Sequence, residues 1–159
     1  SKLTHEGTDY AKKLIRKHRL WEVFLVKHLG FNINAVHPEA ELLEHSTSTE
    51  LADKLEAYLD FPEYCPHGGA ISVDMMEEQE VKTVHLTEAA VGEPVRISRI
   101  VDEDKLLQYF ENHDLKIGDR VKVMDRDASL DLITLHHGTT EKEIQISQTI
   151  AQYLFVEYL

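Results

Sequence analysis

The chain has one cysteine, Cys65, in 159 residues, and no apolar run approaches the roughly 20 residues needed to span a bilayer. A single cysteine cannot form a disulfide within the chain, so stability must come from hydrophobic cores, bound metal or oligomerisation. Residues 1–7 lack the basic and apolar segments of a signal peptide. These absences predict a cytoplasmic protein with a free thiol and no membrane partner.

Basic residues are also scarce. There are 17 Lys and Arg against 29 Asp and Glu, which gives a formal net charge of -12. Affinity for nucleic acid rests largely on basic side chains that neutralise phosphates, so this segment is not expected to bind DNA by itself. The same acidity attracts cations, and 10 histidines beside the carboxylates provide nitrogen and oxygen ligands for divalent metals.

The pattern of apolar residues changes along the chain, from helical spacing in the first part to alternation in the last. No internal repeat or low-complexity tract accompanies the change. The sequence predicts an α+β protein with a helical domain over residues 1–64, a linker over 65–84 and a small SH3-like β-barrel over 85–159.

Three helices are expected in the first domain. An amphipathic stripe from Thr4 to Leu29, stopped by Gly30, predicts one long helix. A proline after His37 predicts a short second helix over residues 39–45. The third is expected to begin with a capping box in which Thr47 accepts from the third helical amide and Glu50 reaches back, and to end before residues 61–62.

The second part reads mainly as short strands. The linker carries Pro66 and two glycines and then an acidic stretch, residues 77–80, which is expected to be exposed. Turns are marked by residues 118–119 and 137–138, and a short helical pattern covers 102–113. Alternating apolar residues predict strands at Val95, Ile97, Val121, Val123, Ile144, Ile146, Leu154 and Val156.

The first candidate metal site is Glu41, Glu44 and His45. On a helix, residues at i, i+3 and i+4 share a face and can converge on one ion. Two carboxylates and one imidazole suit manganese or ferrous iron, although zinc usually binds more tightly. One alternative is a solvated helix face. Another is a zinc hydrolase of the His-x-x-Glu-His type, which is disfavoured because Glu41 occupies the first position.

Other candidate ligands are more ambiguous. Cys65 and His67 lie two apart in a glycine-rich turn, where they could chelate an ion, act as nucleophile and base, or have no chemical role. His18 and Glu22 share a helix face at i and i+4, but a core or surface role is equally compatible with that spacing. Asp102 precedes a helical pattern and could be only its N-cap.

Several motifs, taken together in order, resemble the diphtheria toxin repressor family of metal-dependent transcriptional regulators. The resemblance is close over residues 1 to about 70, and the remainder is similar to the SH3-like domain of the ferrous-iron-transport-A type. The motifs are Leu3-Thr4-x-x-Gly7, Arg16-Lys17-His18-Arg19-Leu20-x-Glu22 and Val36-His37-x-Glu39-Ala40-x-x-x-Glu44-His45.

The resemblance implies two metal sites. Glu41, Glu44 and His45 match the primary site, whose remaining ligand comes from a DNA-binding domain. A glutamate at position 41 implies the manganese-responsive branch, with Fe²⁺ as an alternative. The ancillary site is implied to use Glu22, Cys65, His67 and, as a candidate, Asp102. The thiol would also admit Zn²⁺ or Cd²⁺. His18 and His37 match additional ligands.

The family also places a winged helix-turn-helix domain before Leu3, and the sequence does not contain it. The resemblance therefore implies the effector-sensing and dimerisation part of a repressor of metal homeostasis, which is not an enzyme. Operator DNA would be bound through that other domain, and a homodimer would form through Trp21, Phe24, Leu25 and the helix over 51–59. Two alternatives stay open, namely a metal-binding interaction module and a metallohydrolase.

Overall fold

The computed structural model describes residues 4–159, so the Leu3 position of the first motif lies outside the described residues. The chain divides into two compact units, residues 1–79 and 80–159, and each is described by itself. Within the described residues, no helix combines the length and apolar character needed to cross a membrane.

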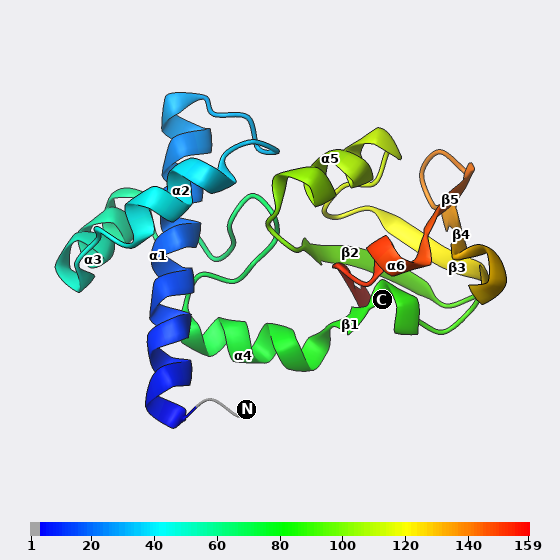
Figure 1. The fold of residues 1–159 in the computed structure, drawn as a ribbon, viewed down its shortest axis with the longest axis horizontal. Helices are drawn as coiled ribbons and strands as arrows, with labels where there is room; N and C mark the ends of the chain where they lie inside the picture. Colours follow the sequence, from blue (N-terminus) through cyan, green and yellow to red (C-terminus); the bar gives the residue numbers. More distant parts are fainter. Residues whose placement is uncertain (1–3) are drawn as a thin grey trace. The chain divides into compact units, whose positions relative to one another are not determined.

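The first unit is built from helices, with α1 as its longest element (Figure 1). Both α2 and α3 pack on α1, and α4 begins in the first unit and continues to residue 82. The helices are α1 (His5–Leu29), α2 (His37–Glu44), α3 (Thr49–Tyr58) and α4 (Val73–Lys82).

The ends of α1 confirm the predicted long helix. The Thr4 side chain accepts a hydrogen bond from the backbone N–H of Gly7 at 3.0 Å, which satisfies one of the free donors of the first turn. Gly30 follows the last helical residue with a φ of 73°, a left-handed conformation that favours glycine. Helix α1 therefore spans seven turns without a break, and it carries His18 and Glu22 near its middle.

The capping box predicted for α3 is wrong by one residue. Ser48, not Thr47, is the N-cap, and its hydroxyl accepts from the backbone N–H of Leu51 at 3.0 Å. The Thr47 hydroxyl is used elsewhere, since it accepts from the Trp21 indole at 2.7 Å and donates to the Leu43 carbonyl at 2.6 Å. Thr47 therefore ties α1 to the end of α2.

Two hydrophobic clusters form the core of the helical unit. One gathers Leu20 of α1 and Leu55 of α3 with Ile71, and the other gathers Leu25, Val36 and neighbouring residues. Trp21 and Phe24, which are half-buried, pack against both clusters. Residues expected at a dimer interface thus also contribute to the core of a single chain, and Leu25 is only 4% exposed.

The acidic stretch 77–80, which the sequence places in a linker, lies in α4. The Ser72 hydroxyl accepts from the backbone N–H of Met75 at 3.2 Å at the start of this helix, and Met76 is buried. The helix follows directly on the turn that carries Cys65 and His67.

The second unit confirms the SH3-like fold class. Its six strands form one antiparallel sheet in the order β1-β6-β2-β3-β4-β5. The strands are β1 (Val84–His85), β2 (Pro94–Ile100), β3 (Arg120–Asp127), β4 (Leu132–His137), β5 (Glu143–Ser147) and β6 (Leu154–Tyr158), with helices α5 (Asp104–Asn112) and α6 (Gln148–Ala151) and 3-10 turns at Leu86–Glu88 and Ala128–Leu130.

The predicted alternation corresponds to the buried face of this sheet. Val121 and Val123 are buried while Lys122 between them is exposed. The prediction missed β1 and β4. In β4 the buried Ile133 and Leu135 do alternate, but the apolar Leu132 before them obscured the period. The core of this unit is separate from that of the helices and centres on the fully buried Phe110 of α5.

Candidate metal centre

Helix α1 supplies the two most central side chains of the site. His18 and Glu22 are four residues apart, so both point to the same face of the helix. Glu22 is 0% exposed and His18 is 8% exposed. A carboxylate is almost never fully buried without a partner, because leaving water costs several kcal/mol, about 3 or more. The burial of Glu22 therefore requires a cation or a proton close to it.

Two imidazoles face the Glu22 carboxylate. His67 Nδ1 lies 3.1 Å and His18 Nε2 lies 3.3 Å from Glu22 Oε2. Neither contact has hydrogen-bond geometry, and among residues 4–159 both oxygens of Glu22 are buried without a hydrogen-bond partner. The nitrogens of His18 and His67 therefore converge on the same carboxylate oxygen of Glu22.

The second ring nitrogen of His67, Nε2, has a partner of its own. His67 Nε2 lies 2.5 Å from the backbone carbonyl of Ile33. A carbonyl only accepts, so Nε2 carries a proton, and Nδ1 is the ring nitrogen that faces Glu22. Metal-binding histidines commonly donate their second N–H to a carbonyl in this way. Sequence reasoning missed the role of Ile33, because a backbone carbonyl leaves no signature in residue type.

Glu22 belongs to two sets of convergent ligand atoms within the helical unit. Glu22, Cys65 and His67 form one set, and His18, Glu22 and His37 contribute to the other. In each set the ligand atoms lie within 4.8 Å of one another. We call these five residues the Glu22 site. All except His37 are buried.

The donor set of the Glu22 site fits a divalent metal ion. Ligands about 2.0–2.3 Å from one ion are close enough to each other to satisfy the observed spacing. A carboxylate and imidazoles suit manganese, iron and zinc, whereas a thiolate favours the softer ions. Glu22 and His67 would hold such an ion, and its charge would compensate the buried carboxylate.

The predicted primary-site residues lie at the end of α2 and are less enclosed. The side chains of Glu41 and His45 are 57% and 62% exposed, while that of Glu44 is 12% exposed. Glu44 Oε1 lies 3.6 Å from His45 Nε2, and its Oε2 lies 3.4 Å from His18 Nδ1. Within the described part of the chain, Glu41, Glu44 and His45 do not form a set of three convergent ligand atoms. Their role as the primary site stays a prediction.

Partial burial changes the chemistry of Glu44. Desolvation raises the pKa of Glu44 above its ordinary value, and the nearby His18 and His45 oppose this rise. A proton therefore competes with a cation for this carboxylate at a higher pH than for an exposed glutamate.

Asp102 belongs to the second unit, in the turn between β2 and α5. The alternative that Asp102 caps α5 is wrong. The helix begins at Asp104, and its N-cap is Glu103, whose side chain makes no capping hydrogen bond. Participation of Asp102 in the Glu22 site stays a prediction.

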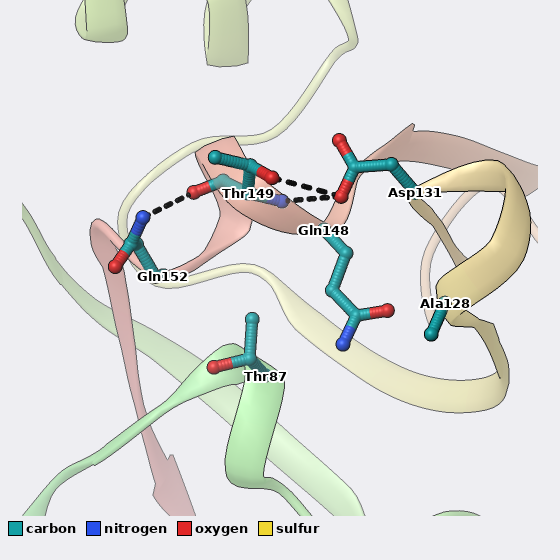
Figure 2. A pocket seen from close by; sticks show the side chains of 6 residues that line it. All are labelled: Thr87, Ala128, Asp131, Gln148, Thr149 and Gln152. Carbon is teal, nitrogen blue, oxygen red and sulfur yellow. Dashed lines mark hydrogen bonds between the residues drawn. The ribbon is translucent and has the colours of Figure 1, made fainter.

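The second unit also contains a polar pocket of about 320 Å³. Figure 2 shows its lining, which comes from the start of the unit, the turn before β4 and the segment around α6. None of the predicted metal ligands lines it. The lining residues are Thr87, Ala128, Asp131, Gln148, Thr149 and Gln152.

Asp131 is the charged residue of that pocket and supports a pH prediction. The hydroxyls of Ser147 and Thr149 and the backbone N–H of Thr149 donate to its carboxylate at 2.8, 2.9 and 3.0 Å (Figure 2 shows the two bonds from Thr149). Because these bonds favour the charged form, with Ser147 contributing most, they lower the pKa of Asp131 below 3.8. The stabilisation is complete above pH 3.8 and is lost as the pH falls through the lowered pKa.

We therefore expect Asp131→Asn to flatten the pH dependence of the free energy of unfolding below pH 3.8. Urea unfolding at a series of acidic pH values measures this slope. Thr149→Val, which removes one donor at nearly constant volume, should flatten it partially. An unchanged slope in Asp131→Asn would show that these hydrogen bonds do not favour the charged form over the protonated form.

Comparisons with known proteins identify the two units and the family. Residues 4–72 match the metal binding and dimerisation domain of iron dependent repressors, and residues 84–158 match the FeoA domain. The diphtheria toxin repressor of Corynebacterium diphtheriae is 31% identical over 169 aligned positions, which cover 99% of this chain and 72% of that protein. A probable metal transport system membrane protein of Chlamydia trachomatis is 49% identical over 65 residues, which cover 41% of this chain but only 14% of that protein.

Among solved structures, the manganese-activated repressor ScaR in its apo form is 37% identical, with a TM-score of 0.86 over 99% of this chain and 74% of that one. The buried donor set, the helical unit and the SH3-like unit define a metal-sensing regulator. The chain belongs to the diphtheria toxin repressor family of metal-dependent transcriptional repressors, which are not enzymes. Family membership removes the metallohydrolase alternative.

Proposed function

We propose that this chain is the effector-sensing and dimerisation part of a manganese-dependent transcriptional repressor that controls metal homeostasis in the cytoplasm. The observation that carries the proposal is the burial of Glu22, whose carboxylate oxygens face two imidazoles without hydrogen bonds. A bound divalent ion explains the charge, the spacing and the ligand types together.

Manganese is proposed for two reasons. Glu41 adds a hard oxygen donor at the position where the resembled iron-responsive branch has a cysteine. Regulators named for manganese, SloR and ScaR, are similar to this chain at 32% and 37% identity. Fe²⁺ is the alternative effector. ScaR has also been solved with Zn²⁺ and with Cd²⁺, and the Cys65 thiol would let these softer ions occupy the Glu22 site.

In the proposed mechanism, Glu41, Glu44 and His45 hold the effector ion together with a ligand from a DNA-binding domain. An ion shared between two domains restricts their relative motion and shifts the population toward one arrangement. In a dimer that arrangement would match two half-sites on operator DNA. This chain supplies the metal ligands and the dimer contacts, and DNA would be read by the other domain.

Helix α3 carries the residues proposed for the dimer contact. Leu51 and Tyr58 are 43% and 66% exposed and lie two turns apart on that helix. Tyr58 also lies near Phe24 and His28, with ring centroids 6.3 and 5.4 Å away. Tyrosine is enriched among interface hot spots, and neighbouring exposed apolar side chains mark surfaces that bind other proteins.

We expect the double substitution Leu51→Glu and Tyr58→Glu to raise the dimer dissociation constant by about a hundredfold or more, since two interface anchors are replaced by charges. Sedimentation equilibrium measures this dissociation constant. Leu42→Glu is the matched control, because Leu42 is 70% exposed on α2 and outside the proposed contact. Equal dimer dissociation constants for the two variants would show that the interface does not include α3.

The role of Asp102 has a direct test. Anomalous diffraction from crystals soaked in Mn²⁺ should give a peak beside Glu22, Cys65 and His67. In Asp102→Ala, we expect the occupancy of that peak to fall and the solution affinity to weaken roughly 10-fold or more, as for loss of a coordinating or supporting group. Full occupancy in the variant would show that Asp102 of the second unit is not part of the site.

The interaction-module alternative predicts a different result. If the ligand residues are incidental, no anomalous peak appears at either the Glu22 site or at Glu41, Glu44 and His45. The proposed function predicts a strong peak at the Glu22 site and a weak or absent one at Glu41, Glu44 and His45 when only residues 1–159 are in the crystal.

A further inference from the structure

The turn that carries Cys65 and His67 is itself buried. Gly68, Gly69 and Ala70 are buried along with both ligands. Buried backbone N–H and C=O groups must find partners within the protein, and a turn has no neighbouring strand or helical repeat to supply them all. Some of the partners come from the backbone of the turn itself, and others come from side chains of the surrounding helices.

Gln79 of α4 uses both ends of its side-chain amide on this turn. Its Nε2 donates to the Gly68 carbonyl at 2.7 Å, and its Oε1 accepts from the backbone N–H of Ala70 at 3.0 Å. The amide thus bridges two backbone groups that are two residues apart, immediately after His67. Such a pair of bonds constrains both the position and the orientation of the turn relative to α4.

Other bonds hold the turn internally or fix it to α1. Within the turn, the backbone N–H of Cys65 donates to the Gly69 carbonyl at 2.8 Å, and that of Gly68 donates to the Cys65 carbonyl at 3.0 Å. Arg19 of α1 donates to the Ala70 carbonyl at 2.6 Å. The internal bonds set the shape of the turn, and Gln79 and Arg19 set where it lies.

We propose that Gln79 is a positioning residue for the Glu22 site, holding the Cys65 and His67 ligands at the distance from Glu22 that metal binding needs. This inference rests on the proposed function, because it assumes that the Glu22 site binds an ion. A thiolate and an imidazole on one turn move together when the turn shifts. Removing a supporting hydrogen bond of this kind typically weakens metal affinity roughly 10- to 100-fold.

Cobalt(II) titration of the whole chain tests the inference, because a cobalt–thiolate bond gives a charge-transfer absorption band that reports ligation by Cys65. Two variants are compared with wild type. Gln79→Met keeps the length of the side chain and removes both hydrogen bonds. Gln79→Glu keeps the acceptor for Ala70 but places a carboxylate oxygen against the Gly68 carbonyl. Both should weaken Co²⁺ binding roughly 10- to 100-fold and reduce the band at saturation.

Three further measurements separate the outcomes. Gln108→Glu, an exposed glutamine of α5, should bind cobalt like wild type. A melting temperature and a circular dichroism spectrum without metal show whether each variant folds. If both Gln79 variants only melt earlier, while their affinity and saturated spectrum equal those of wild type, Gln79 is a structural residue and the inference is overturned.

Cys65→Ser distinguishes this failure from that of the proposed function. If wild type shows the thiolate band and Cys65→Ser does not, the Glu22 site binds metal and the Gln79 variants decide the inference. If wild type shows no band and Cys65→Ser binds cobalt equally well, the site itself is wrong and the inference falls with it.

Discussion

Replacing Glu22 by glutamine is expected to abolish the stabilisation of this chain by divalent metal while leaving the metal-free chain at least as stable as wild type. For wild type, metal at 100 times its dissociation constant should stabilise the fold by about 2.7 kcal/mol. Glu22 contributes to both sets of convergent ligand atoms, so its loss affects the whole Glu22 site. An amide oxygen is neutral and holds a divalent ion far more weakly than a carboxylate does.

The opposite effect on the metal-free chain follows from burial. Glu22 is 0% exposed, and its oxygens have no hydrogen-bond partner among the described residues. A buried polar group without a hydrogen bond costs about 1–3 kcal/mol, and more when it is charged. Glutamine has the same shape without the charge. The variant should therefore unfold at an equal or higher temperature once metal is removed.

Calorimetric unfolding with excess Mn²⁺ and with a chelator measures both effects. Glu50→Gln, an exposed change on α3, serves as the control and should keep the full response to metal. A residue that merely supports the fold would lose stability under both conditions. That result for Glu22→Gln would contradict the metal-binding role.

The two expected effects have opposite signs, and together they would explain why a carboxylate is tolerated in this core. Leu20, on the same helix, is buried among apolar side chains and contributes to stability with or without metal. Glu22 is equally buried but favours the fold only when a cation is near. If the Glu22 site binds an ion as proposed, the helical unit should be more stable with metal than without it, which is the coupling between metal and structure that a sensor needs.

Much of the secondary structure could be predicted from local signals. The cap at Thr4 and the glycine at position 30 bound α1, and alternation at Val121 and Val123 marks β3. One error arose where two residues could serve one role. Thr47 and Ser48 are both good caps, and the tertiary bond from Trp21 to Thr47 decided between them. No local pattern contains that contact.

The candidate site was predicted unevenly for a similar reason. Helical spacing alone places His18 beside Glu22, since both lie on one face of α1. The approach of His67 to Glu22 within 3.1 Å joins residues 45 positions apart, and only the family resemblance suggested it. The Ile33 carbonyl and the side-chain amide of Gln79 were not found by motif reading, because only the packed structure shows which groups they contact.

The thiol of Cys65 provides the second large effect, a change in metal preference. Cys65 is 6% exposed and its sulfur lies within 4.8 Å of the ligand atoms of Glu22 and His67. Sulfur donors favour soft ions such as Cd²⁺, whereas Mn²⁺ prefers oxygen and nitrogen. Cys65→Ser exchanges the sulfur for an oxygen at nearly constant shape, so it separates the contribution of softness from that of packing.

We expect Cys65→Ser to weaken Cd²⁺ binding by more than about a hundredfold, since loss of a direct ligand should exceed the roughly 10- to 100-fold effect of a supporting group. Mn²⁺ binding should change by less than about tenfold, because a hydroxyl or a water molecule can replace the sulfur for a hard ion. Competition titrations against a metal-sensitive dye give both constants. Cys65→Ala is the control for the hydroxyl group that Cys65→Ser introduces into the core. An equal loss for the two ions would mean that the sulfur does not discriminate between them, and no loss for either would mean that it does not coordinate. A selective loss of Cd²⁺ would show that this one side chain determines how strongly the site binds the softer metals.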